Sequence, residues 1–130
     1  VLFRSSHKID QMEAIARLRN HPTSTRKMRL MADLIRGKQV EQALGILQFT
    51  KKHNSTPLYK LLLSAIDNWK QKNPGSRPED SNLVVKTIMV DQGVTIRRYT
   101  NAPQGRMYRI RKRSNHVTLV VDSKVENVKA

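Results

Sequence analysis

The chain has 130 residues, of which 25 are Lys or Arg and 10 are Asp or Glu, so that its formal net charge is +15. This length holds one domain with a modest core and is too short for two, and so large a positive charge repels itself unless a polyanion such as nucleic acid neutralises it. The absence of cysteine excludes disulfides and thiolate metal sites and suits the cytoplasm, and no apolar run approaches the roughly 18 residues of a membrane span, so we expect no membrane partner.

Residues 1–11 contain neither an initiator Met nor the apolar core of a signal peptide, and we expect an N-terminal tail there, ahead of a single domain over residues 12–130. Residues 12–18 are a short mixed stretch. They fit a strand that contains Ile15 and ends before Asn20-His21-Pro22.

A first helix is predicted over residues 27–36, with Thr23 or Ser24 as its N-cap and Gly37 in a left-handed C-cap. At about 100° per residue, the apolar side chains fill one arc of this helix: Met28, Leu30, Met31, Ala32, Leu34 and Ile35. The opposite arc holds Arg26, Arg29, Asp33 and Arg36. One face therefore packs on a core, and the other is basic.

A second helix is predicted over residues 40–51, because Val40, Ala43, Leu44 and Leu47 share one side. A third begins with Ser55 or Thr56 as cap and Pro57 at the first helical position, and it ends before Asn73. Its apolar residues have helical spacing: Leu58, Leu61, Leu62, Ala65, Ile66 and Trp69. Residues 70–82 contain two prolines and a glycine and are expected to form a loop.

The rest of the chain has the pattern of a long β-hairpin over residues 83–121. Strand segments are predicted at 83–90, 94–99, 108–111 and 117–121, with turn residues at 101–105 and the tip near Pro103. Arms of about 18 residues could reach roughly 60 Å, whereas a domain of this size has a radius of gyration of about 14 Å. We therefore expect the tip, taken as residues 97–106, to project beyond the body.

The projecting arm is cationic, since no Asp or Glu lies between Asp91 and Asp122. Its middle has too little apolar surface for a core of its own and is expected to be ordered by a ligand. Arginine binds phosphate oxygens without reading sequence, and irregular RNA folds accept an inserted arm better than a duplex groove does. Folded RNA is therefore the favoured partner.

Several blocks of the sequence resemble those of one known family. In chain order they are Ser24-Thr25-Arg26-Lys27-Met28-Arg29-Leu30, Ala32-Asp33-Leu34-Ile35-Arg36-Gly37-Lys38, Ala43-Leu44-Gly45-Ile46-Leu47, Ser64-Ala65-Ile66-Asp67-Asn68, Val90-Asp91-Gln92-Gly93, Gln104-Gly105-Arg106 and Lys112-Arg113-Ser114-Asn115-His116-Val117-Thr118. With these blocks the sequence resembles the bacterial large-subunit ribosomal protein twenty-two family, universal ribosomal proteins with an extended hairpin at the peptide exit tunnel.

The resemblance implies an α+β fold in which three helices pack on a small antiparallel three-stranded sheet and a long β-hairpin projects. It implies a structural constituent of the large ribosomal subunit, not an enzyme, that binds large-subunit ribosomal RNA and supports assembly. The partners so implied are that RNA, neighbouring large-subunit proteins and, near the hairpin tip in the tunnel, the nascent polypeptide. One copy per ribosome is implied, rather than a homo-oligomer.

The same resemblance suggests which residues contact RNA. On the body they are Arg17, Arg19, Arg26, Lys27, Arg29, Arg36 and Lys38. On the hairpin, where RNA or the tunnel is contacted, they are Arg97, Arg98, Tyr99, Asn101, Pro103, Gln104, Gly105, Arg106, Arg109, Arg111, Lys112, Arg113 and His116. The tip differs from that of many relatives, which have Pro-Arg-Ala where this chain has Asn101-Ala102-Pro103.

Catalytic and cofactor motifs are weak in this sequence. Ser24 and Lys27 have the spacing of one serine hydrolase class, but Ser24 is better explained as a helix cap. Gly37-Lys38 fails as a phosphate-binding loop, because Gln39 follows in place of Ser or Thr. The four histidines lack ligand spacing, so a structural or RNA-stacking role is expected for His116, and no metal or cofactor is implied.

One alternative function remains, that of a DNA-architectural protein whose basic β-arm enters the minor groove. Such proteins usually work as symmetric dimers with an apolar wedge at the arm tip. Here Pro103 is the only plausible wedge, and the helices are used in one small core. Affinities for ribosomal RNA and random duplex DNA at the same salt would separate the two hypotheses.

Overall fold

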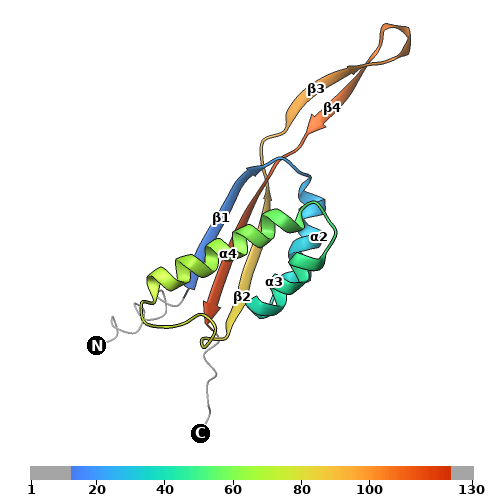
Figure 1. Ribbon diagram of the computed structural model, residues 1–130. Coiled ribbons are helices and arrows are strands. Elements are labelled where there is room, and N and C mark those ends of the chain that lie inside the picture. Colours follow the sequence, from blue (N-terminus) through green and yellow to red (C-terminus); the bar gives the residue numbers. More distant parts are fainter. Residues whose placement is uncertain (1–12, 124–130) are drawn as a thin grey trace.

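The computed structural model describes residues 13–123 (Figure 1). The tail expected over residues 1–11 lies outside the described residues. Across 13–123, no helix is both long enough and apolar enough to pass through a membrane.

Three antiparallel strands form the sheet of the body: β1 (Glu13–His21), β2 (Leu83–Gln92) and β5 (Asn115–Ser123). Their order is β1-β5-β2, so the last strand of the chain lies in the middle. In β5 the residues alternate between a buried face, with Val117, Leu119 and Val121, and a half-buried face. This period of two places one apolar face of the sheet against the helices.

Strand β1 lies where the sequence predicted a strand but continues to His21. Ile15 belongs to it and is 42% exposed, because it faces away from the helices, whereas Ala14 and Ala16 are buried. The small side chains on the covered face suit the close packing of a helix against this strand, and α4 (Ser55–Lys72) does pack there.

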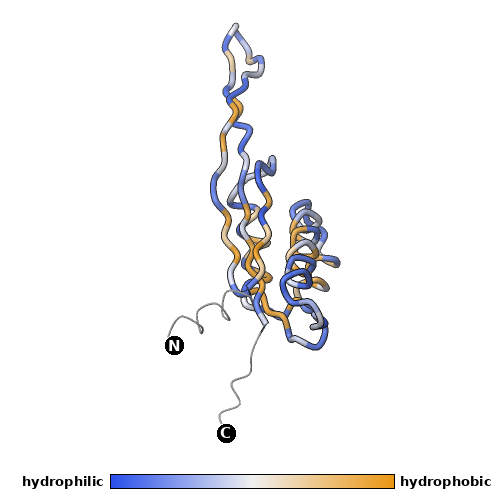
Figure 2. The backbone as a smooth tube through the Cα atoms, turned by 90° about the vertical axis from the view of Figure 1, so that its left-hand side faces the viewer, coloured by the Kyte–Doolittle hydropathy of each residue, from blue (hydrophilic) through white to orange (hydrophobic). Residues whose placement is uncertain are grey.

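All helices lie on one side of the sheet (Figures 1 and 2). Helix α4 packs on β1 and β5, α2 (Thr25–Ile35) packs on β2, and α3 (Val40–Phe49) packs mainly against α4. The largest fully buried side chains come from both layers and include Met28, Met31, Leu58, Leu62 and Leu119. The α+β fold of three helices on a three-stranded antiparallel sheet is therefore confirmed.

Helix α2 starts two residues earlier than expected, at Thr25, and Ser24 holds the N-cap position. The Ser24 side chain makes no capping hydrogen bond, and its backbone carbonyl instead accepts the Met28 N–H at 3.2 Å. The side-chain cap expected from the sequence is therefore wrong in detail. Gly37 has φ +74°, as a left-handed C-cap residue requires.

The apolar arc predicted for α2 was too wide. Leu30 is 59% and Leu34 is 42% exposed, whereas Met28, Met31, Ala32 and Ile35 are buried. The reason is that α2 lies at the edge of the molecule and packs on one side only, against β2 and α3.

The ends of the other two helices also differ from the prediction. Helix α3 stops at Phe49, two residues early, and α4 begins at Ser55 with Asn54 as its N-cap. Pro57 is thus the third helical residue, which is tolerated because backbone nitrogens of the first turn have no intrahelical acceptor. The loop expected from residue 70 begins only at 73, since Lys70 and Lys72 complete the last turn of α4.

Beyond the sheet, β3 (Ile96–Asn101) and β4 (Met107–Lys112) pair as a separate two-stranded antiparallel ribbon that extends away from the body (Figure 1). The turn near Pro103 is confirmed as a short 3-10 segment, Pro103–Gly105. The range 97–106 was too long for the tip, because residues 97–101 are paired strand. Gln104 and Gly105 have φ of 63° and 70°, and this reverses the chain in few residues.

Candidate nucleic-acid interface

The register of the β3–β4 ribbon sorts its side chains onto two faces. Arg97 lies opposite Arg111, and Tyr99 lies opposite Arg109. Because directly opposite residues share a face and alternate residues do as well, these four side chains occupy one face, which we call the arginine face. A hollow of about 170 Å³ there is lined by Arg97, Tyr99, Arg109, Ile110 and Arg111.

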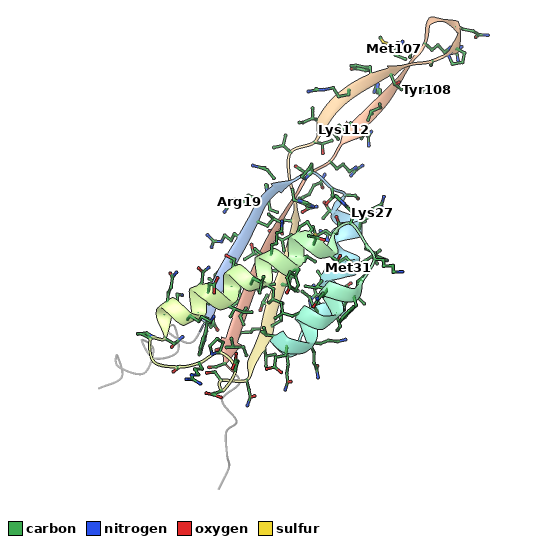
Figure 3. All side chains as sticks on the ribbon, in the orientation of Figure 1. Arg19, Lys27, Met31, Met107, Tyr108 and Lys112 are labelled. Carbon is green, nitrogen blue, oxygen red and sulfur yellow. The ribbon has the colours of Figure 1, made fainter. Side chains whose placement is uncertain are left out.

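The second face of the ribbon is mixed. It carries Ile96 opposite Lys112, Arg98 opposite Ile110, and Thr100 opposite Tyr108. Arg98 folds back, and its Nη1 donates to the Arg97 carbonyl at 2.9 Å. Tyr108 lies near the turn (Figure 3), and this face therefore offers apolar contacts between two cations.

Among residues 13–123, no ion pair neutralises the arginine face. Within residues 13–123, the ion pairs join Arg36 to Asp33, Lys70 to Asp67, and Lys86 to Glu13 and Asp122, and none of them reaches the ribbon. Like charges placed directly opposite each other on a ribbon destabilise it. An anion between Arg97 and Arg111 would remove that repulsion, and a flat base could stack on Tyr99.

The turn at the ribbon's end exposes Pro103, Gln104, Gly105 and Arg106. It is closed by the Ala102 N–H, which donates to the Arg106 carbonyl at 2.9 Å. Arg106 is the one charged side chain of this turn.

A tight junction joins the ribbon to the body. The Gly93 N–H donates to the Ser114 carbonyl at 2.9 Å, and the Ser114 hydroxyl donates to the Val94 carbonyl at 2.7 Å. A Cβ at Gly93 would lie 2.5 Å from the Ser114 Oγ and 3.2 Å from its backbone carbonyl. The two strands approach this closely only because residue 93 is glycine.

Next to the junction, Asn115 is fully buried, and its Nδ2 donates to the Thr23 carbonyl at 2.9 Å and to the Thr23 Oγ1 at 2.8 Å. The Nδ1 of His116 accepts the Asn20 N–H at 3.0 Å. His116 therefore has a structural contact through its Nδ1. Together these bonds fix the β1–α2 turn against the base of the ribbon.

Cations surround this corner as well. Lys112 and Arg113 line a hollow of about 430 Å³ together with Ser24, Val94 and Ile96. Lys112 extends from the base of the ribbon (Figure 3). The hollow thus joins the start of α2 to the ribbon, and the cations that line it all come from the ribbon side.

Arg29 of α2 and Arg36 at its C-cap have structural partners that the sequence did not reveal. The Nη2 of Arg29 donates to the Val90 carbonyl at 3.2 Å, and the Nη2 of Arg36 donates to the Ile88 carbonyl at 3.1 Å. Both carbonyls belong to β2, an edge strand of the sheet. Further along the same edge, the Val85 carbonyl accepts the Gly37 N–H at 3.1 Å. Both residues are nevertheless exposed, so other guanidinium N–H groups face outward.

The remaining expected body residues lie on two sides of the molecule. Arg26, Lys27 and Lys38 are exposed on or beside α2, and the Lys38 carbonyl accepts the Val85 N–H at 3.0 Å. Arg17 and Arg19 alternate with Ala16 and Leu18 in β1 and so lie on the sheet face that the helices leave open, where Arg19 points away from them (Figure 3). The expected set is therefore spread over several surfaces.

Sequence reasoning missed Lys52 and His53, which line a hollow of about 600 Å³ with Lys27, Leu30 and Asn54. The signal was present as the run Lys51-Lys52-His53 between two helices. Close by, burial lowers the pKa of His21, and the nearby charge of His53 lowers it further, against the side chain of Asn54, whose oxygen would accept from the protonated ring and raises it. The residues from 13 to 123 contain no group of three or more His, Asp or Glu side chains placed to hold a metal ion.

Comparisons with known proteins agree on one family. The sequence model of the family described as ribosomal protein L22p/L17e matches residues 16–122. Large ribosomal subunit protein uL22 of Flavobacterium johnsoniae is 59% identical over 108 residues, which is 83% of this chain and 79% of the relative. The uL22 of Bacteroides fragilis strain YCH46 is 58% identical over 112 residues, 86% of this chain and 82% of the relative. That of Chlorobium phaeobacteroides is 54% identical, and the match covers 86% of this chain and 96% of the relative.

Proposed function

This chain belongs to the ribosomal protein L22p/L17e family and is a structural, non-catalytic constituent of the large ribosomal subunit, and from this premise we propose that its ribbon and body bind large-subunit ribosomal RNA and support assembly. The observation that carries the proposal is the arginine face. Arg97, Arg109 and Arg111 lie together without a carboxylate, on an element that the body does not cover. Such a face suits the phosphates of a folded RNA.

The body would add RNA contacts on two sides. Arg26, Lys27 and Lys38 point outward around α2, and Arg29 holds β2 while keeping other N–H groups for phosphate. Arg36 also holds β2, but its Nη1 pairs with Asp33, so it offers fewer N–H groups. Arg17 and Arg19 lie on the open sheet face. Basic groups on opposite sides of a small body suit a protein that is enclosed by RNA rather than docked on one flat surface.

The turn of the ribbon would line the peptide exit tunnel, close to the nascent polypeptide. Two features of the turn support this role. It is the part of the structure that reaches furthest from the body (Figure 1), and Arg106 is the one charged side chain among residues 101–106. Neighbouring large-subunit proteins are further partners in this proposal, with one copy of the chain in each cytoplasmic ribosome.

The test is binding of the full chain to large-subunit ribosomal RNA over a range of salt concentrations. Arg97→Gln/Arg111→Gln should weaken binding and make the salt dependence shallower by roughly 0.7 to 0.9 log unit per lost phosphate contact. Lys60→Gln/Arg77→Gln, which removes two exposed charges outside the expected interface, is the matched control.

Two outcomes would contradict the proposal. In one, both double variants change RNA affinity equally, and the arginine face then has no special role. In the other, random duplex DNA binds as tightly as ribosomal RNA at the same salt, which favours the DNA-architectural alternative.

A further inference from the structure

The body has an apolar groove. The start of β2, which helps to form it, lies at the end of the body opposite the ribbon (Figure 1). The volume of the groove is about 400 Å³, and it is formed by α3, α4, the loop over residues 73–82 and the start of β2. The apolar residues that line it are Val40, Leu44, Leu63, Ile66 and Leu83. The groove shares no lining residue with any hollow described above.

The groove is continuous with the hydrophobic core. Val40 and Leu83 are 6% and 4% exposed and belong to the core, while Leu44 and Ile66 are partly buried against it. Leu63 is 40% exposed. An apolar side chain inserted here would contact the edge of the core and cover Leu63, and such burial favours association.

The charge of the groove is opposite to that of the rest of the molecule. Glu41 of α3 and Glu79 of the loop line it, and neither forms an ion pair with any residue from 13 to 123. Lys70 also lines it, but lies 3.8 Å from the Asp67 carboxylate. Two unpaired carboxylates in a chain of net charge +15 disfavour RNA phosphate at this place.

We propose that this groove binds a short segment of another large-subunit protein in which an apolar side chain lies next to Lys or Arg. The apolar side chain would enter between Leu44, Leu63 and Ile66, and the cation would pair with Glu41 or Glu79. A Debye length of about 8 to 10 Å screens the more distant positive charges of the chain, so the local carboxylates decide the sign.

The location of the partner in the large subunit rests on the proposed function, and a crosslinking experiment tests it there. The full chain is made with a photoreactive benzoylphenylalanine at Leu63, or at Leu34 as the control, and is assembled into large subunits. Leu34 is 42% exposed on α2, so the two positions are matched in exposure.

After irradiation, we expect the Leu63 position to crosslink to one protein, at a peptide in which an apolar residue adjoins Lys or Arg, and the Leu34 position not to yield that adduct. Crosslinks from Leu63 to RNA, to a second copy of the chain, to the chain itself or to an acidic peptide would overturn the proposal, as would the absence of any adduct. If the chain does not enter large subunits, the proposed function fails instead, and the following experiment decides on the groove.

The second experiment uses the free full chain and a capped hexapeptide of alternating Leu and Lys, titrated by calorimetry. The Leu-Lys peptide should bind, whereas a Leu-Glu peptide should not. Glu41→Gln/Glu79→Gln should weaken binding roughly fivefold, as expected for the loss of two exposed ion pairs, and this effect should be smaller at high salt. Asp33→Asn/Asp91→Asn removes two exposed carboxylates that do not line the groove and should change affinity by less than about twofold. Equal effects of the two double variants, or no binding of the Leu-Lys peptide, would refute the groove as a site for basic segments.

Discussion

Single side chains of this protein serve the fold and the interface at once. Arg29 and Arg36 donate to the carbonyls of Val90 and Ile88, and so saturate part of an edge strand. The other N–H groups of Arg29 remain available, and Arg36 also pairs with Asp33 through its Nη1. An arginine has five donors in a fixed fork, which makes this double use possible. A lysine at either position could bind the β2 carbonyl or a phosphate with its single ammonium group, but it could not bind both with the geometry of the guanidinium group.

Gly93 is the residue on which the junction depends most. In Gly93→Ala, the new methyl group would displace the Ser114 hydroxyl from the Val94 carbonyl and press on the Ser114 backbone. We expect the free energy of unfolding to fall by about 1 kcal/mol, which is the size of one lost hydrogen bond plus local strain.

Gly45→Ala is the matched control, because a Cβ at this position in α3 meets no atom within 4 Å. It should raise the free energy of unfolding by about 0.5 to 1 kcal/mol through helix propensity. Urea unfolding of both variants measures the difference. If Gly93→Ala is as stable as the parent protein, close approach at the junction does not matter.

His21 should make stability depend on pH. Burial and the charge of His53 lower its pKa in the folded state below the ordinary value of 6.5, so the folded protein binds a proton less readily than the unfolded chain. The contribution of His21 is therefore fully present above pH 6.5 and is lost as the pH falls below it. Urea unfolding at pH 7.5 and at pH 5.5 measures this effect. Between the two pH values, the free energy of unfolding should fall by less in His21→Gln than in the parent protein.

His53→Gln provides the companion measurement. It removes the neighbouring positive charge and leaves the burial of His21 in place, so the loss of stability at low pH should shrink only in part. An unchanged pH dependence in His21→Gln would mean that other groups cause it.

At the scale of elements, the ribbon and the body are separable in their packing. No residue between 97 and 111 belongs to the hydrophobic core, and Ile96 lies directly opposite Lys112. Deletion of residues 97–111 with an Asn-Gly turn between Ile96 and Lys112 therefore fits the existing register as a two-residue hairpin. It removes Arg97, Arg98, Arg106, Arg109 and Arg111.

The shortened chain should keep its body fold, as circular dichroism would show, and should still bind ribosomal RNA at low salt. The salt dependence should be shallower, because counterion release falls with each lost phosphate contact. Replacing the same five arginines by Gln in a full-length ribbon separates charge from length. Loss of RNA binding at low salt by a folded deletion variant would show that the ribbon, not the body, is the anchor.

At the scale of the whole molecule, different chemistry lies at opposite ends. The ribbon and its junction are cationic, while the far end of the body holds the groove with Glu41 and Glu79 and the contacts of Lys86 with Glu13 and Asp122. Nucleic acid and protein would therefore meet this small protein at different ends, without competing for one surface.

The sequence by itself determined the charge, the three helices, the turn near Pro103 and the arm without carboxylates. These features depend on local patterns, namely helical or alternating spacing, turn residues and composition, which a single stretch of chain contains in full. The family resemblance added the expected contact residues. Element ends were less accurate, as at Pro57, because the cap is decided by backbone bonds rather than residue type alone.

The tertiary structure alone decided that β5 lies between β1 and β2, that Leu30 and Leu34 remain exposed, and that Arg29 and Arg36 bind β2. It also brought Glu41 and Glu79 to one groove. Each of these results joins residues far apart in the chain or depends on which side of an element is covered. Periodicity shows which side of an element is apolar but not what packs against it, so only the folded arrangement of the elements settles such contacts.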